Sequence, residues 1–226
     1  MKGDTIMNTT NQTEQELMNY ISAHKILNTH SHHLQEQAMT DFNLNKLIGS
    51  SYLQWQQVTP GTTAESRSVF LEKMRYRSFF VWLQKAIQEL YGISDPITPQ
   101  NWDQISDLIH KAHQDPSFYT EVLKNKCKYQ KIIVDTYWNP GTNNGKPELF
   151  TPSFRLDLFF LGYKKGLRNH DGVSLEEQFG ELPDNLNDYI EWVRKWILKK
   201  KSDGCVALKV AIAYERSLHF EKVTPK

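Results

Sequence analysis

A chain of 226 residues can build one large core or two small ones, and its 39% hydrophobic and 23% charged residues are typical of a folded, soluble protein. A net charge of +1 provides no overall field that would attract nucleic acid or an anionic membrane, so we expect neither partner. No apolar stretch approaches the roughly 18 residues of a membrane-spanning helix, and the two cysteines lack metal-binding spacing. These features predict a cytoplasmic protein.

The chain begins with a predicted helix and a predicted strand. Residues 14–23 carry apolar side chains at helical spacing, and they lead into a short apolar run, residues 25–29. The sequence turns abruptly polar at His30. We therefore predict that the first strand ends near Thr29.

The next segment, residues 34–126, is predicted to be helical throughout. Apolar residues recur at three- and four-residue steps over residues 67–91, which predicts one long helix, and again over residues 98–113. Asp115 stands before a proline, a pairing typical of a helix start, and that helix should run to about residue 125. At about 90 residues the segment is too long for a plain connection between strands.

The remainder alternates between strand-like and helix-like runs. Strands are predicted over residues 131–137, 153–160 and 205–212, and a helix over residues 187–200 that ends in three lysines. Cations are favoured at the negative end of a helix dipole, so these lysines are interpreted as a helix terminus. Alternating strands and helices predict a parallel sheet with helices outside it.

Three histidines lie together at the polar end of the predicted first strand. Successive side chains of a strand point to opposite faces, so His30 and His32 project together while Ser31 and His33 point away. Two imidazoles on one side suit a divalent metal, with zinc the first choice and iron or manganese as alternatives. The other interpretation is a polar strand end without a metal. Ligands of parallel α/β proteins bind beyond the carboxyl ends of strands, which favours the metal site.

A His-x-His pair that ends the first strand resembles the signature of the amidohydrolase superfamily, and the long insertion after it is similar to the uronate isomerase-like branch. The resemblance implies an α/β fold, a partial (β/α)8 TIM barrel of about four strands. In that interpretation residues 1–226 form a single incomplete barrel domain, and residues 34–126 are a helical insertion within it.

The resemblance also assigns roles to two basic residues. Arg155 lies in an Arg-x-Asp sequence that, in the uronate isomerase relatives, helps to hold a substrate carboxylate; the alternative is an ion pair with Asp157. Lys209 lies in an otherwise apolar strand where several amidohydrolases carry a catalytic lysine that becomes carboxylated. The alternative for Lys209 is a surface lysine paired near Glu215.

Three residues at the end of the second predicted strand are candidates for a substrate pocket. Asp135, Tyr137 and Trp138 should lie at the same rim as the histidines, because the carboxyl ends of parallel strands share one edge of the sheet. The alternative is ordinary turn chemistry, since Asn, Pro and Gly follow directly.

The resemblance predicts a metal-dependent hydrolase in which a divalent metal activates water against an amide- or ester-like carbonyl of a small molecule. The uronate isomerase-like alternative is an enzyme that interconverts aldose and ketose forms of a sugar acid. A third possibility is a non-catalytic remnant or interaction protein, and a helical nucleic-acid module ranks last. Because a complete barrel needs about 250 residues, we expect the N-terminal half of an enzyme, with a complementing C-terminal half or a second copy as partner.

Overall fold

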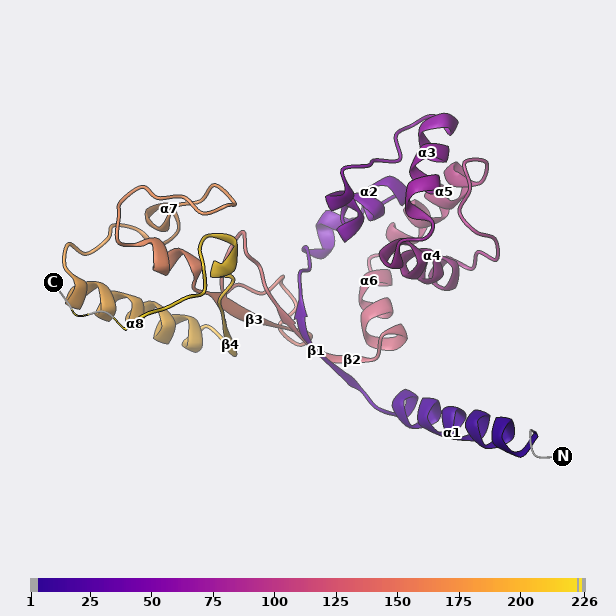
Figure 1. Ribbon diagram of the computed structural model, residues 1–226, viewed down its shortest axis with the longest axis horizontal. Coiled ribbons are helices and arrows are strands. Elements are labelled where there is room, and N and C mark those ends of the chain that lie inside the picture. Colours follow the sequence, from indigo (N-terminus) through magenta and orange to yellow (C-terminus); the bar gives the residue numbers. More distant parts are fainter. Residues whose placement is uncertain (1–3, 223, 225–226) are drawn as a thin grey trace. The chain divides into compact units, whose positions relative to one another are not determined.

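We describe the chain from a computed structural model, which covers residues 4–222 and 224. The chain divides into two compact units (Figure 1). The sheet unit comprises the described residues up to His33 together with those from Tyr129 onward, and the helical unit comprises residues 34–128. All strands found in the described part of the chain belong to the sheet unit.

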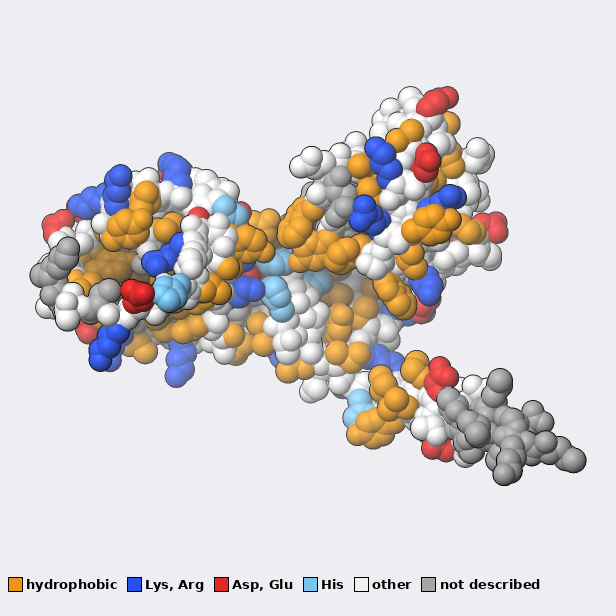
Figure 2. Space-filling view, in the orientation of Figure 1, with side chains coloured by type: hydrophobic (Ala, Val, Ile, Leu, Met, Phe, Trp, Pro, Cys, Tyr) orange, Lys and Arg blue, Asp and Glu red, His pale blue; other side chains and the backbone are white. Residues whose placement is uncertain are grey.

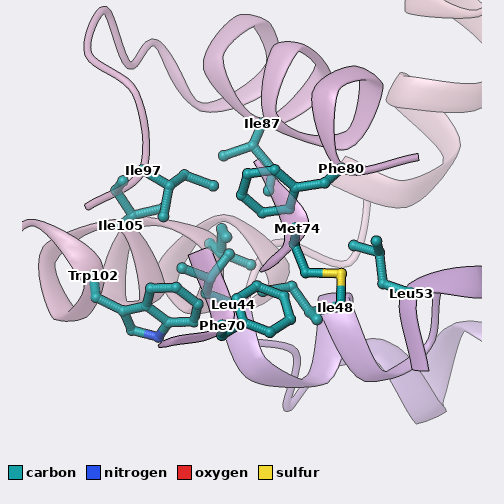
Figure 3. Close-up of a cluster of buried hydrophobic side chains, with 11 residues drawn as sticks. Leu44, Ile48, Leu53, Phe70, Met74, Phe80, Ile87, Ile97, Trp102 and Ile105 are labelled. Carbon is teal, nitrogen blue, oxygen red and sulfur yellow. The ribbon is translucent and has the colours of Figure 1, made fainter. Parts of the chain in front are cut away.

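The helical unit contains only helical elements, as predicted for residues 34–126. They are α2 (Leu44–Gly49), α3 (Ala64–Met74), α4 (Ser78–Tyr91), α5 (Trp102–His113) and α6 (Phe118–Glu121), with short 3-10 or π turns at Glu36–Met39, Tyr52–Gln56 and Val122–Lys126. Their apolar faces meet in one core (Figure 3), where the ring of Phe70 packs edge-on against those of Phe80 and Trp102. The Trp102 indole donates to Asn45 Oδ1 at 2.9 Å, so its one polar atom is satisfied.

The prediction of one long helix over residues 67–91 is wrong, because α3 and α4 are separate. The break falls at residues 75–77, where Arg77 has an extended backbone with φ −76° and ψ 133°. Met74 before the break and Phe80 after it are both buried in the same core. The apolar spacing therefore continues across the turn, and periodicity alone does not reveal it.

The sheet unit is built on four parallel strands, which confirms an α/β fold with a parallel sheet. They are β1 (Ile26–Ser31), β2 (Tyr129–Val134), β3 (Phe150–Arg155) and β4 (Ala207–Lys209), in that order across the sheet. The strand predicted over residues 153–160 is wrong at its end, because β3 stops at Arg155. A 3-10 turn at Asp157–Leu161 follows, and Asp157 accepts a hydrogen bond from the Ala211 backbone N–H.

The two edge strands bring side chains together across the whole sheet. Lys209 Nζ on β4 lies 3.2 Å from His30 Nε2 near the end of β1. In a flat sheet these strands would be about 14 Å apart and their side chains would stand perpendicular to it. Their meeting indicates that the sheet is curled, with His30 and Lys209 on its concave face.

Helices cover the convex face of β3. Phe154 is fully buried there in a second core that includes Phe159 and Leu175, with Trp192 and Trp196 of α8 packed against it. The covering helices are α7 (Leu175–Phe179) and α8 (Leu186–Ser202). The three lysines at residues 199–201 occupy the last turn of α8, as predicted.

A further helix, α1 (Asp4–Ala23), precedes β1. Its described side chains, residues 11–23, are all exposed. Neither α1 nor any other described helix is long and apolar enough to span a membrane. Both cysteines, Cys127 and Cys205, are free of disulfide bonds and partly buried.

Candidate metal centre

His30 and His32 lie on one side of the chain at the end of β1. Their ring centroids are 5.0 Å apart with an interplanar angle of 75°. Parallel pairing of Ser31 with Val134 sets the ends of β1 and β2 side by side, and the Asp135 N–H donates to the Ser31 carbonyl at 2.9 Å. The first residue after β2 is therefore held directly beside the histidine pair.

The tautomer of His32 follows from a single hydrogen bond. Its Nδ1 lies 2.7 Å from the backbone carbonyl oxygen of Asp135. A carbonyl oxygen only accepts, so Nδ1 carries the proton and Nε2 keeps its lone pair. This arrangement, an imidazole fixed through one nitrogen and open at the other, is the usual state of a metal-ligating histidine.

Asp135 is the third member of the cluster, and it is buried. One carboxylate oxygen, Oδ2, accepts from Arg155 Nη2 at 2.8 Å and lies 3.9 Å from His30 Nε2. The other, Oδ1, is buried without a hydrogen-bond partner. A buried carboxylate oxygen with no partner is costly, and a cation at this position would satisfy it.

The three side chains meet the distance requirement for one ion. One potential ligand atom from each of His30, His32 and Asp135 lies within 4.8 Å of the other two. Two imidazoles and a carboxylate form a donor set that suits zinc or iron. Among the described residues, this is the group of histidine, cysteine and acidic side chains whose spacing can hold a metal.

Lys209, predicted to be catalytic, reaches the same cluster. It pairs with Arg155 in the β3–β4 register, and its ammonium can donate to His30 Nε2 over their 3.2 Å separation. Burial lowers the pKa of His30, and Lys209 and His32 lower it further, while Asp135 opposes them. His30 is therefore neutral near pH 7, the form in which an imidazole binds a metal.

Arg155, predicted to hold a substrate carboxylate, contacts two carboxylates of the protein. Besides its hydrogen bond to Asp135, its Nε lies 3.6 Å from Asp157 Oδ2. Its guanidinium also lies over the Tyr137 ring, 5.5 Å from the centroid. The ion pair with Asp157 was the alternative interpretation of the sequence; the pair with Asp135 was not foreseen.

Tyr137 and Trp138 form an aromatic wall beside the histidines. The Tyr137 ring is 5.6 Å from that of His32 and 4.8 Å from that of Trp138, and both side chains are more than two-fifths exposed. The turn interpretation also holds, because Thr136 Oγ1 bonds to the carbonyls of Asn139 and Thr142. The turn thus provides a hydrogen-bond partner for its own backbone carbonyls and places the rings of Tyr137 and Trp138 beside the site.

Sequence reasoning placed Asp135 at the rim as a substrate-binding residue and missed its possible role as a ligand. The available signal was its position, directly after an apolar strand that neighbours the histidine strand. Which oxygen of Asp135 is satisfied depends on Arg155, 20 residues away, and no local pattern contains that information. Neither models of protein families nor curated proteins give a match to this chain.

Proposed function

We propose that this chain is a metal-dependent hydrolase of the amidohydrolase type, with His30, His32 and Asp135 as ligands of a divalent ion. One observation carries the proposal: three ligand atoms converge at the carboxyl ends of two parallel strands, and a buried carboxylate oxygen among them has no partner. Active sites of (β/α)-barrels lie at that end of the strands. In this proposal the four curled strands are part of such a barrel.

A bound divalent ion, with zinc the best fit and iron or manganese as alternatives, would supply Lewis-acid chemistry and lower the pKa of water toward neutrality. The protein prepares the ligands for it. Arg155 holds one oxygen of Asp135 and leaves the other free, and a backbone carbonyl orients His32. These contacts reduce the freedom that the ligands would lose on binding an ion.

Lys209 is the proposed catalytic residue of the chain. By resemblance to the amidohydrolases it would be carboxylated and would join the ligands. Unmodified, its ammonium lies close enough to the cluster to stabilise negative charge on a substrate oxygen. The exposed rings of Tyr137 and Trp138 would contact the apolar part of a small substrate.

The carboxylate ligand departs from the amidohydrolase pattern, in which an aspartate comes from the last strand. Here Asp135 follows the second strand. The uronate isomerase-like alternative requires an arginine that is free to hold a substrate carboxylate. Arg155 is committed to Asp135 and Asp157, so its contacts favour a hydrolase over an isomerase.

Metal-dependent hydrolysis tests this function. Protein stripped with a chelator would be reloaded with Zn²⁺, Mn²⁺ or Fe²⁺ and assayed on a panel of chromogenic esters, lactones and anilides. We expect hydrolysis that requires the metal and falls at least 100-fold in Asp135→Asn, since a ligand and its charge are lost. The control Asp184→Asn changes an exposed aspartate paired only with Lys165 and should retain activity. Hydrolysis unaffected by the chelator, or equal in Asp135→Asn, would contradict the proposal.

A further inference from the structure

Both edges of the parallel sheet are open. Within the described part of the chain, β1 pairs with β2 and β4 pairs with β3, so the outer edge of each of these two strands has no neighbouring strand. Natural edge strands are usually protected by charges, prolines or bulges. In β4 the side chain that points to the convex face, Leu208, is apolar.

The convex face of β4 lacks the cover that β3 has. Leu208 pairs with Phe154 in register, so both side chains point to the same face. Phe154 is fully buried beneath α8, yet Leu208 is 53% exposed, and its neighbours Val206 and Val210 are 62% and 48% exposed. Three consecutive outward side chains therefore form an uncovered apolar strip at the edge of the sheet, which we call the β4 strip.

The helix α1 carries an exposed stripe of apolar side chains that could cover such a strip. Leu17 and Ile21 lie one helical turn apart, Met18 is beside them, and all three are at least half exposed. Figure 2 shows hydrophobic side chains gathered at the end of this helix that leads into β1. Only residues 24–25 separate α1 from β1.

We propose that two copies of this chain associate by pairing β4 of each with β1 of the other, closing an eight-stranded parallel barrel. A helix joined to a strand by two residues must lie close to that strand. The copy that offers β1 to the open edge of β4 thus brings its own α1 to the convex face, where its apolar stripe covers the β4 strip. In this dimer, β1 of the second copy pairs with the open edge of β4, and α1 of the second copy covers the β4 strip.

Geometry and charge both select a second copy as the partner. A contact between two different edges forms a ring or an open polymer, and two copies close the ring when each contributes half of it, which gives a dimer with two-fold symmetry. Four curled strands are half of an eight-stranded barrel, the size whose interior side chains fill. The net charge of +1 also gives two copies little mutual repulsion. The inference rests on the barrel geometry proposed above and does not depend on hydrolytic activity.

Sedimentation velocity on the full chain, across a concentration series, tests the association. The expected particle has twice the 26.5 kDa mass of one chain and does not grow further at high concentration. Leu208→Glu and Leu17→Glu should each weaken the dimer at least tenfold. Both side chains are exposed, so circular dichroism should show that the fold is retained. Tyr76→Glu, at an 81% exposed position of the helical unit, is the control and should dimerise normally.

Mixing the two variants distinguishes pairing of β4 with β1 from pairing of the same strand in both copies. A dimer of one Leu208→Glu chain and one Leu17→Glu chain carries both substitutions at one junction and none at the other. Both junctions are weakened in either variant alone, whereas the mixed dimer keeps one unsubstituted junction. Substitutions that each abolish their own junction should therefore leave only the mixture able to dimerise. A chain that stays single at all concentrations, a larger ring or polymer, or a dimer unaffected by both variants would overturn the proposal. Failure of the hydrolase assay would leave these outcomes unchanged.

Discussion

The helical unit and the sheet unit differ in what they bury. The core of the helical unit consists of apolar side chains around Phe70 and Trp102. All the buried polar or charged residues found in the described chain lie in the sheet unit, and they include Asp135 and Asp157. Buried carboxylates lower stability unless they are paired, and both are held by Arg155 beside the histidine cluster, as the proposed metal centre requires.

The two units also differ in how the starts of their helices and the edges of their strands are covered. In the helical unit, the side chains of Asn43 and Thr63 cap the starts of α2 and α3. In the sheet unit, both edge strands are open and the β4 strip is exposed. The helical unit therefore buries its apolar faces within itself, and the sheet unit carries the two edges at which we propose that a second copy binds.

The largest effect is expected in the apolar core. Trp102→Ala should lower the free energy of unfolding by about 4 kcal/mol, because it removes a fully buried indole and leaves a cavity. The matched variant Trp82→Ala changes an indole that is 67% exposed and should lower it by less than about 1 kcal/mol. Chemical denaturation of both proteins measures the difference. Similar losses would mean that this core does not stabilise the helical unit as described.

Arg155→Met should reduce stability by about 3 kcal/mol, since it leaves Asp135 and Asp157 buried without their cation. The exposed pair of Arg168 with Glu177 provides the control, and Arg168→Met should lower stability by less than about 1 kcal/mol. Denaturant titrations near pH 7 check both values. A stable Arg155→Met protein would show that the two carboxylates tolerate burial without this arginine.

His33 should make the sheet unit sensitive to acid. Burial lowers its pKa from the usual 6.5 to about 4, so as pH falls the unfolded chain takes up the proton before the folded chain does. The stability associated with neutral His33 is present in full above about pH 6.5. It is lost progressively as pH falls toward about 4, by up to about 3 kcal/mol.

Unfolding measured across this pH window in the native chain and in His33→Leu checks the expectation. The leucine variant keeps an apolar contact with Phe150, whose ring is 5.1 Å from that of His33, and should lose stability less steeply in acid. Equal slopes in the two proteins would rule out His33 as the source of the acid sensitivity.

The smallest effects are expected at two matched helix caps. Thr63 begins α3 in the helical unit and Ser174 begins α7 in the sheet unit, each within a capping box. Thr63→Ala and Ser174→Ala should each lower stability by about 1 kcal/mol, because one backbone N–H loses its acceptor. Thermal unfolding of the two variants is the measurement. A much larger loss at Ser174 would indicate that α7 holds the sheet-unit core in place rather than only covering it.

The local elements were largely predictable from the sequence, and the contacts between them were not. Helical spacing predicted α5 and α8, and alternation of strands with helices predicted the parallel sheet. The turn at residues 75–77 was not predicted, because the two flanking helices bury side chains in the same core and the apolar spacing continues across the turn. The predicted strands 131–137, 153–160 and 205–212 end three to five residues beyond β2, β3 and β4. After β3 the chain turns away at Asp157, which accepts a hydrogen bond from the distant Ala211 backbone.

In the candidate site too, local features were predictable from the sequence and contacts between distant residues were not. The placement of His30 and His32 on one side follows from strand geometry, which is local. The position of Asp135 between them and Arg155 depends on the register of three strands that are far apart in sequence. The contact of Lys209 with His30 spans 179 positions and requires a curled sheet, which no pattern in the sequence encodes.

Metal content is the most direct test of the central claim that His30, His32 and Asp135 form a metal centre. Elemental mass spectrometry would be performed on the full chain after equilibration with Zn²⁺ and removal of excess ion. The account predicts about one ion per chain, lost in the His30→Ala, His32→Ala double variant, strongly reduced in Asp135→Asn and retained in Asp184→Asn. No retained ion, or the same content in all four proteins, would contradict it.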